Sequence, residues 1–505
     1  MLSFMSYINR LSLFLAVALV FGCVEEETFP DMGLAVSGPI GVAKSSDGDY
    51  FYVLNSDFEW IYNSGSILVL QDENDTLEKK AALKVPRLGR DMQVAKDASG
   101  SDRMVALFDR PGTDELAKVY QIGLKSAPTL SAVKVWDIDC SPLSVAVADS
   151  YDRFFVGCKN GDLYAGVYAA EDGSGGSLKL VRSYGKARRA MYIDTKNNLL
   201  LAFPTDLERQ TTIDAKELDK FSFVIPQGAQ EGQMVEASNE VPDKFEESTR
   251  VRRQVANRYI YQFIVYDIAA EEAKGSPYRM IGDLKNPEAS WESRWLYFPL
   301  DDEVTGADRD VNDEGFYRIY RTNFFKAMAN PFGDGEHFFL SHRGSVASSN
   351  NILKVSIVGD IKPIDPVDGA CNADTHRLDQ GKCIPLTSKV LNVEEGIYGA
   401  SGEVDDLHYT GDFDLGTVNS QRMLFVNHFR DLVFWPADRR RFSVVAKILD
   451  GDQQTGKLES GSHLESFYGI SVNSRGNGLS CSFYGGTILQ LKVQAGRVEL
   501  VKHIN

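Results

Sequence analysis

The chain has 505 residues, of which 43% are hydrophobic and 11% aromatic, and its formal net charge is −17. An apolar fraction of this size excludes a largely disordered chain, and the length suffices for one large domain or two ordinary ones. The excess of negative charge argues against nucleic acid as a partner and against a broad electrostatic hold on anionic lipid.

The first 22 residues have the pattern of an export signal. Arg10 precedes an apolar run over residues 11–21, and Cys23 follows it. A positive start, a short apolar stretch and a small residue at its end are typical of a secretory signal peptide. The run is too short to span a bilayer, which needs about 20 apolar residues. We therefore predict a signal peptide over residues 1–22.

The end of this signal resembles the bacterial lipobox, in which a small residue precedes a cysteine that is acylated and becomes the new N-terminus. The residues that carry the resemblance are Val20-Phe21-Gly22-Cys23, and Phe21 departs from the small or β-branched residue usual at its position. The resemblance implies a lipoprotein that carries several acyl chains (such as palmitate) on Cys23, and more than one chain is needed for stable membrane attachment. The alternative is an ordinary signal peptide with an incidental cysteine.

In bacterial lipoproteins, the residue after the acylated cysteine indicates in which membrane the protein is retained. Residue 24 is Val rather than the Asp that favours inner-membrane retention, so the resemblance implies the outer membrane of a Gram-negative envelope. The resemblance does not indicate which side of the outer membrane the domain faces. Residues 23–33 are then a lipidated tether, and residues 34–505 form the folded domain.

Short apolar runs bounded by Gly, Asp, Asn and Ser dominate the domain and predict an all-β fold. Three segments show the same order of apolar strand, polar turn with Asp and second apolar strand: residues 40–54, 92–107 and 143–156. Val42, Val94 and Val145 occupy equivalent places in this alignment. Residues 190–203 continue the series and residues 468–483 close it. A repeat of this length indicates a β-propeller with four strands per blade. A β-sandwich is the alternative, but it requires no such repeat.

One segment resembles the YVTN repeat of bacterial propellers. Residues 47–72 contain an Asp-Gly turn and the strand Tyr52-Val53-Leu54-Asn55, with Leu54 in place of Thr. The resemblance implies the propeller fold and carries over no catalytic residue, because the motif is structural. We expect seven blades, with six or eight as alternatives. We also expect residues 34–37 and 487–503 to share the closing blade.

Two regions interrupt the repeat and are predicted to be large insertions, about residues 205–258 and 323–400. The second holds Cys371 and Cys383, which we predict to form a loop-closing disulfide in an oxidising envelope. Cys140 and Cys158 are expected to bridge two strands of one blade. Cys481 is then left over as a small buried apolar residue.

An acidic loop after the first insertion is a candidate calcium site. Asp308, Asp310 and Asn312 alternate as the first ligands of an EF-hand loop do, and calcium prefers six to eight oxygen ligands. Asp313 stands where such a loop requires Gly, and Ile319 where it requires Glu. A solvated acidic hairpin loop between residues 295–300 and 316–321 is the alternative. No cofactor other than this calcium ion is implied.

His408 and His428, with Asp412 and Asp414 nearby, are candidates for a site at the channel mouth of the propeller. Surface or half-buried histidines are the alternative, because no metal-ligand spacing links them. No GxSxG elbow and no GxxxxGK[ST] loop is present in the sequence.

The sequence thus favours an envelope-anchored binding or scaffolding module whose partner is an envelope protein or a polysaccharide. The alternative is a metal-assisted hydrolase or lactonase with its site at the channel mouth.

Overall fold

The computed structural model describes residues 29–58, 60–110, 115–125, 127–183, 187–204, 211–214, 234–236, 264–268, 280–281, 294–296, 316–319, 323–332, 337–343, 351–357, 364–372, 376–379, 382–385, 391–396, 410–428, 432–436, 446–448, 467–482, 486–494 and 497–505. The export signal, Cys23, His408 and the acidic loop with Asp308, Asp310 and Asn312 all lie outside these residues. Among the described residues, no helix is long and apolar enough to cross a membrane.

All elements named in the described residues are β-strands. Most of them form seven antiparallel sheets of four strands each, numbered here from first to seventh along the chain. Their strands are β1 (Pro39–Lys44), β2 (Tyr50–Asn55), β3 (Gly65–Glu73) and β4 (Thr76–Val85); β5 (Gly89–Lys96), β6 (Asp102–Phe108), β7 (Ala117–Gly123) and β8 (Ser131–Ile138); β9 (Pro142–Ala146), β10 (Arg153–Cys158), β11 (Asp162–Ala169) and β12 (Gly175–Ser183); β13 (Arg188–Asp194), β14 (Leu199–Pro204), β17 (Ile264–Asp267) and β18 (Met280–Ile281); β21 (Asn323–Ala329), β22 (His337–Arg343), β23 (Asn351–Ile357) and β26 (Leu391–Gly396); β27 (Thr410–Val418), β28 (Gln421–His428), β29 (Leu432–Pro436) and β30 (Ala446–Ile448); β31 (Phe467–Val472), β32 (Asn477–Ser482), β33 (Thr487–Gln494) and β34 (Arg497–Ile504).

The remaining strands form two-stranded pairs outside these sheets. They are β15 (Thr211–Asp214) with β20 (Phe316–Ile319), β16 (Met234–Glu236) with β19 (Arg294–Leu296), and β24 (His376–Asp379) with β25 (Lys382–Pro385). Because β19 pairs with β16 and β20 pairs with β15, the acidic loop does not connect two partners of one hairpin.

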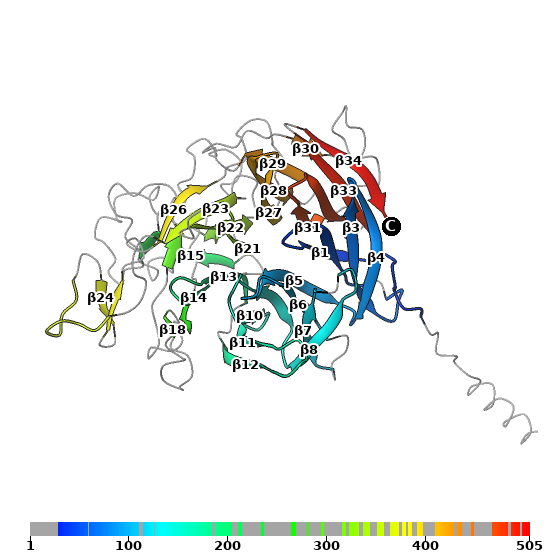
Figure 1. Cartoon of the computed structure of the whole chain (residues 1–505). Helices are drawn as coiled ribbons and strands as arrows, with labels where there is room; N and C mark the ends of the chain where they lie inside the picture. Colours follow the sequence, from blue (N-terminus) through cyan, green and yellow to red (C-terminus); the bar gives the residue numbers. More distant parts are fainter. Residues whose placement is uncertain are drawn as a thin grey trace, which may run out of the picture.

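The seven sheets close into a ring with the first strand of each sheet innermost (Figure 1). The first strand of each sheet contacts the first strand of the next, in the order β1, β5, β9, β13, β21, β27 and β31, and β31 contacts β1. Within each sheet the chain runs outward from this innermost strand. Radial four-stranded sheets around a channel define a β-propeller, so the predicted all-β propeller fold is confirmed.

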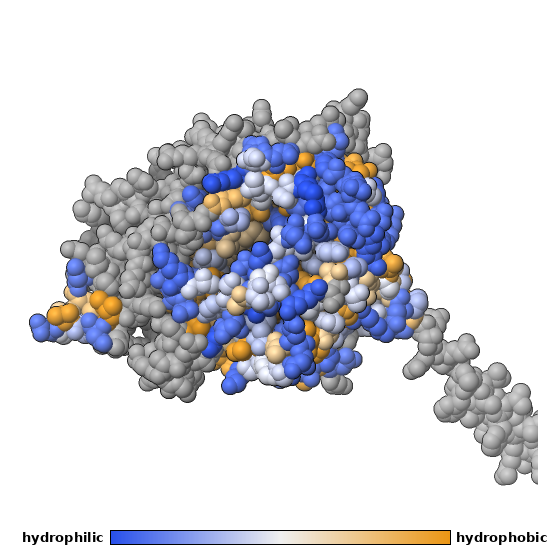
Figure 2. Space-filling model, in the orientation of Figure 1, coloured by the Kyte–Doolittle hydropathy of each residue, from blue (hydrophilic) through white to orange (hydrophobic). Residues whose placement is uncertain are grey.

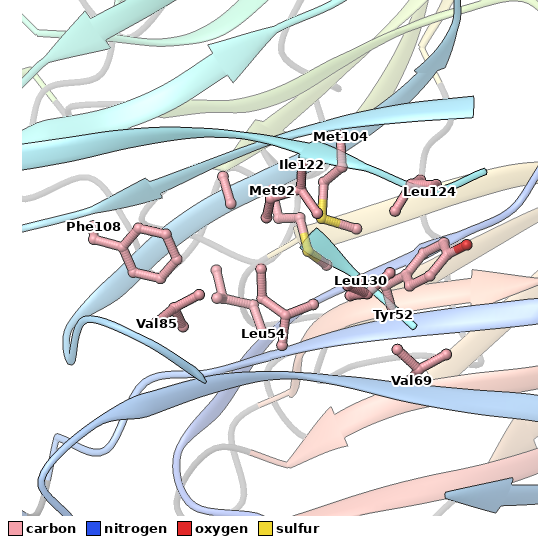
Figure 3. Packing of buried hydrophobic residues seen from close by; sticks show 12 residues of the cluster. Tyr52, Leu54, Val69, Val85, Met92, Met104, Phe108, Ile122, Leu124 and Leu130 are labelled. Carbon is pink, nitrogen blue, oxygen red and sulfur yellow. The ribbon is translucent and has the colours of Figure 1, made fainter. Parts of the chain in front are cut away.

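Apolar side chains between neighbouring sheets make up the core of the ring. The second strand of the first sheet, Tyr50–Asn55, is apolar on both faces because each face packs against an adjacent sheet. Figure 3 shows one such cluster, in which Tyr52 and Leu54 of β2 meet Met92 of β5 and Met104 of β6. The outermost strand β4 has polar residues on its exposed face (Figure 2). Burial between sheets, rather than in one central core, therefore stabilises the fold.

The ring closes differently from the prediction. The seventh sheet takes all four of its strands from residues 467–504, and residues 34–37 lie outside any strand, so the expectation of a shared closing blade is wrong. Side chains hold this seam instead. Asn473 donates a hydrogen bond to the Gly48 carbonyl oxygen at 2.9 Å, and Arg475 donates to it at 2.7 Å. Gly48 has φ +75°, and a Cβ atom there would lie 2.8 Å from the Asn473 Cβ, so the turn needs glycine.

Three long connections occur in the sheet order, and one of them, residues 282–322, joins β18 of the fourth sheet to β21 of the fifth. Residues 205–263 lie between β14 and β17, which are neighbours in the fourth sheet. Residues 323–400 hold the four strands of the fifth sheet, and the long connection there is confined to residues 358–390, between β23 and β26.

Candidate functional site at the mouth of the central channel

A β-bulge near the start of the innermost strand recurs in all seven sheets. The register shift falls at Ile40 in β1, Arg90 in β5 and Arg189 in β13. Equivalent shifts occur in β9, β21, β27 and β31. A bulge adds a residue that has no partner in the ladder and turns its side chain in a new direction. The repeat therefore presents one extra side chain per sheet at the same end of the channel.

These bulge residues line a pocket of about 570 Å³, a volume that includes space open to solvent. Every innermost strand except β9 contributes to its wall. The charged lining residues are Arg90, Asp91, Arg189, Lys326 and Asp412. The apolar and aromatic ones are Ile40, Val42, Met92, Met191, Phe325 and Tyr468. A concave site with apolar walls and a few convergent charges is typical of ligand pockets.

Two lysine–aspartate pairs connect the strands on one side of the pocket. Lys326 Nζ lies 2.5 Å from Asp412 Oδ1 and also donates to the Phe413 carbonyl oxygen at 2.8 Å. Lys44 Nζ lies 2.5 Å from Asp414 Oδ2. These contacts join β21 to β27 and β1 to β27. Burial raises the pKa of the Asp412 carboxyl, although Lys326 opposes this shift. Burial lowers the pKa of Lys326, but Asp412 and the other nearby carboxylates outweigh it, so that the pKa of the ammonium is raised.

Aspartates on the innermost strands also bind the backbone of the next sheet. Asp91 on β5 accepts a hydrogen bond from the Val145 N–H of β9 at 2.8 Å. Asp414 on β27 accepts one from the Val472 N–H of β31 at 2.9 Å. Burial raises the pKa of the Asp91 carboxyl above its ordinary value. A half-buried pocket carboxyl with a raised pKa is a candidate for both binding and proton transfer.

A second charge cluster surrounds Asp109, which follows β6. Arg90 donates two hydrogen bonds to Asp109 Oδ2, at 3.0 and 2.6 Å, and the Ser141 hydroxyl donates one at 2.7 Å. Lys159 Nζ lies 3.6 Å from the same oxygen. Burial raises the pKa of Asp109, but the bonds from Ser141 and Arg90 outweigh burial and lower it overall. Arg90 thus contributes both to the pocket wall and to this cluster.

Aromatic rings contact two of the pocket guanidinium groups. The Arg189 guanidinium lies 3.5 Å from the Phe325 ring centroid, and the Arg90 guanidinium lies 5.5 Å from the Phe58 ring centroid. Stacking of this kind holds the planar group in place.

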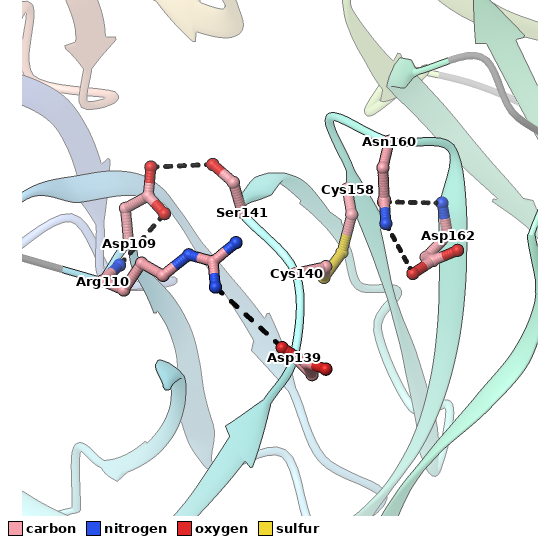
Figure 4. Close-up of a disulfide and its surroundings, with 8 residues drawn as sticks. All are labelled: Asp109, Arg110, Asp139, Cys140, Ser141, Cys158, Asn160 and Asp162. Carbon is pink, nitrogen blue, oxygen red and sulfur yellow. Dashed lines mark hydrogen bonds and ion pairs between the residues drawn. A yellow bond between two sulfur atoms is a disulfide. The ribbon is translucent and has the colours of Figure 1, made fainter. Parts of the chain in front are cut away.

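A disulfide fixes the connection next to the Asp109 cluster. Cys140 and Cys158 are bonded, with Cα atoms 6.1 Å apart (Figure 4). The expected pairing is confirmed, but Cys140 lies in the connection between β8 and β9, whereas a bridge between two strands was expected. Ser141, the next residue, is thereby held near Asp109.

The other cysteines agree with the sequence analysis. Cys371 and Cys383 are bonded with Cα atoms 5.4 Å apart, as predicted. Cys481 is free and buried in β32, and burial raises the pKa of its thiol.

The structure brings together only part of the sequence-predicted site. Asp412 and Asp414 lie on the innermost strand β27, and Asp412 lines the pocket. His428 ends β28, the second strand of that sheet, and His408 lies outside the described residues. Within the described ranges, no group of three or more His, Cys, Asp or Glu residues is arranged to hold a metal ion.

Sequence reasoning missed Arg90, Asp91, Arg189 and Lys326. Their one shared signal is a charged residue at the start of the apolar first strand of a repeat, as in Arg90-Asp91 before Met92 and Arg189 before Met191. A charge at that position departs from the alternation of a buried strand and could have indicated a bulge.

No family model and no curated protein sequence matches the chain. Among solved structures, it is similar to the β-propeller domain of Cps50 (Swd1) from Myceliophteria thermophila, with TM-score 0.47 and 8% identity over 92% of this chain and 98% of that one. It is also similar to Sqt1 from Chaetomium thermophilum bound to the N-terminus of ribosomal protein L10, with TM-score 0.41 and 11% identity over 94% and 90% of the two chains. A third is a candidate 6-phosphogluconolactonase from Bacteroides uniformis, with TM-score 0.41 and 10% identity over 92% and 95%. The outward strand order of its own sheets and their closed ring identify the chain as a β-propeller.

Proposed function

We propose that this chain is a lipid-tethered, seven-bladed propeller that acts as a binding module for an envelope component, with its ligand site at the channel mouth. Each four-stranded sheet is one blade. The observation that carries the proposal is the recurrent bulge, because it directs residues from six innermost strands into one pocket with both charges and apolar walls.

The contacts of the pocket carboxylates favour binding over acid–base catalysis. Asp412 is paired with Lys326 and accepts backbone N–H bonds from Phe413 and Ile470. Asp91 accepts N–H bonds from Val145 and Met92. Oxygens engaged in this way hold neighbouring blades in register, and a general base needs access to a substrate proton.

Binding by the mature chain tests the proposal. Residues 23–505 without lipid are applied to immobilised envelope polysaccharides and envelope peptides, and we expect selective binding. The Phe325→Ala variant removes an aromatic wall of the pocket and should lose at least tenfold in affinity, which corresponds to about 1.4 kcal/mol. Lys84→Ala is the control, because Lys84 lies on the outermost strand β4 with 64% of its side chain exposed. Equal binding by the two variants would place the ligand site elsewhere.

A hydrolase at the same mouth is the second candidate, and the raised pKa of Asp91 favours it. On this alternative Asp91 donates or accepts a proton while Arg189 or Lys326 polarises the substrate. Turnover of lactone or ester substrates that is lost in Asp91→Asn and retained in Lys84→Ala would support it. Retention of turnover in Asp91→Asn would contradict it.

The tether is tested separately. If Cys23 is acylated, a clickable palmitate analogue labels the wild-type protein in cells, and Cys23→Ser loses the label and leaves the membrane fraction. Membrane retention of the Cys23→Ser protein would mean that another segment anchors it.

A further inference from the structure

We propose that the channel mouth binds its ligand through an oxyanion, either a carboxylate or a phosphate, held by Arg189, Arg90 and Lys159. This inference rests on the proposed function, since it names the chemistry of the group that the same pocket takes.

The balance of charge at the mouth is opposite to that of the whole chain. The chain carries a formal charge of −17. The pocket wall holds the acids Asp91 and Asp412 and the cations Arg90, Arg189 and Lys326, and directly behind it Arg90 and Lys159 face Asp109. Positive charge is therefore in excess there even when all three carboxyls are ionised. Burial raises the pKa of Asp91, and its protonation would enlarge the excess.

The surroundings of Lys159 show the effect of this excess of positive charge. Its ammonium shares Asp109 with Arg90, and the Arg90 contact is the shorter at 2.6 Å, against 3.6 Å for Lys159. Burial lowers the pKa of Lys159, and repulsion from Arg90 and Arg189 lowers it further, while Asp109 opposes the shift. A bound anion would relieve this repulsion, so the unliganded mouth favours anion binding.

The groups present are suited to oxyanions. Guanidinium groups present several N–H donors in one plane and match the geometry of carboxylate and phosphate. Phe325 stacks on Arg189 and Phe58 lies over Arg90, which restrains both planes. The restraint reduces the entropy that binding would cost.

The rest of the pocket indicates what carries the oxyanion. Met92, Met191 and Tyr468 form apolar walls beside the charges. The space enclosed by the walls is only about 50 Å³ and the pocket opens to solvent, so the walls contact the acidic group and the rest of the ligand extends outward from the mouth. The ligand class is therefore a small acidic organic molecule or the end of an acidic glycan.

Calorimetry with defined probes tests this inference on residues 23–505. The probes are a galacturonate trisaccharide for the carboxylate, a hexose phosphate and inorganic phosphate for the phosphate, and maltotriose as the neutral control. We expect one acidic probe to bind at least tenfold more tightly than maltotriose, with affinity that falls as salt is raised. The acidic probe that binds identifies the oxyanion as a carboxylate or a phosphate. Equal affinity for inorganic phosphate and hexose phosphate would show that the sugar ring of the ligand contributes no binding energy.

Variants separate the role of charge from folding. Arg189→Gln should lose at least tenfold in affinity for the acidic probe, Arg189→Lys should lose less, and Lys84→Gln should lose nothing. Affinity should also fall as pH rises through the lowered pKa of Lys159, and Lys159→Gln should remove this pH dependence. Thermal midpoints identify any variant that fails to fold. If Arg189→Gln does not fold, the affinity of Lys159→Gln decides whether charge at the mouth binds the ligand, because Lys159 is half-exposed and its replacement disturbs packing least.

Equal binding of maltotriose and the acidic probes, or full affinity in both Arg189→Gln and Lys159→Gln, would overturn the inference. If envelope ligands bind in a Phe325-dependent manner but no acidic probe does, the inference fails and the proposed function stands. If neither binds, both fail.

Discussion

Asp109 is the residue on which the charges behind the mouth converge. It accepts bonds from Arg90 and Ser141, which belong to different sheets or connections, and its side chain is only 8% exposed. A buried carboxylate in this position stabilises the fold only while it stays ionised and paired. Asp91, on the same strand as Arg90, shows the opposite shift, because burial raises its pKa by more than the N–H bond from Val145 and the nearby cations Arg189 and Lys326 lower it.

Replacing Asp109 tests this role. We expect Asp109→Asn to lower the free energy of unfolding by about 1–3 kcal/mol, because Arg90 loses a charged acceptor. The folded-state pKa of Asp109 is lowered from 3.8, so its contribution is fully present above that value and is lost as pH falls through the folded pKa. Urea unfolding between pH 3 and pH 7 measures both effects.

The matched control is Asp137→Asn, which removes an exposed partner of Lys118 at 2.7 Å. An exposed pair of this kind contributes at most about 1 kcal/mol. Equal losses in the two variants would mean that burial of Asp109 adds nothing.

At the scale of elements, the connection between β8 and β9 carries the disulfide that orders one side of the mouth. The bond joins Cys140 and Cys158, which are 18 positions apart in the sequence. The Cys371–Cys383 bond joins cysteines only 12 positions apart, and its closed segment contains β24 and ends within β25, a hairpin that lies outside the seven sheets. The two bonds should therefore differ in their effect on the stability of the ring.

Removing each bond tests this difference. The double variant Cys140→Ala/Cys158→Ala should lower the free energy of unfolding by about 3 kcal/mol, from the entropy of the closed loop. The double variant Cys371→Ala/Cys383→Ala should leave the main unfolding transition within about 0.5 kcal/mol. Differential scanning calorimetry compares the two. A larger loss from the second pair would show that the hairpin is coupled to the ring.

At the scale of the whole molecule, polar side chains close the ring between its first and last sheets. Asp72, next to the turn from β3 to β4, accepts bonds from Asn473 and Asn477 at 2.7 Å and from Arg475 at 3.0 Å. Lys502 donates to the Leu77 carbonyl oxygen at 3.1 Å along the same seam. Without a strand exchanged between the ends of the chain, these contacts and the apolar packing between the two sheets resist opening.

Opening of this seam is measurable. Asp72→Ala removes the acceptor shared by three side chains, and we expect a loss of about 2–4 kcal/mol in stability. Hydrogen exchange should accelerate in β3, β4, β31 and β32 before it does in β10 and β11. Asp31→Ala, which removes an exposed partner of Lys84, is the control. Uniform acceleration around the ring would show that the seam is no weaker than the other contacts between sheets.

The sequence by itself determined the strands and therefore the class of fold. The pairs Asp47-Gly48 and Asn160-Gly161 mark turns, and Gly48 and Gly161 adopt positive φ. Short apolar runs bounded by such turns, such as Phe51–Leu54, indicate strands covered on both faces. Those signals are local, and the same strand–turn–strand pattern recurs along the chain, which indicates a propeller. The disulfide Cys371–Cys383 followed from the same local reasoning.

Only the tertiary structure decided the channel mouth and the closure of the ring. Val94 was aligned with Val42, but Met92 is the residue of β5 that lies two positions after the bulge, as Val42 does in β1. The position of the bulge, which the sequence spacing does not show, therefore corrects this alignment by two residues. Lys44 and Asp414 are 370 residues apart, and Asn473 and Asp72 are 401 apart. No local pattern links such residues, because the ring alone brings them together.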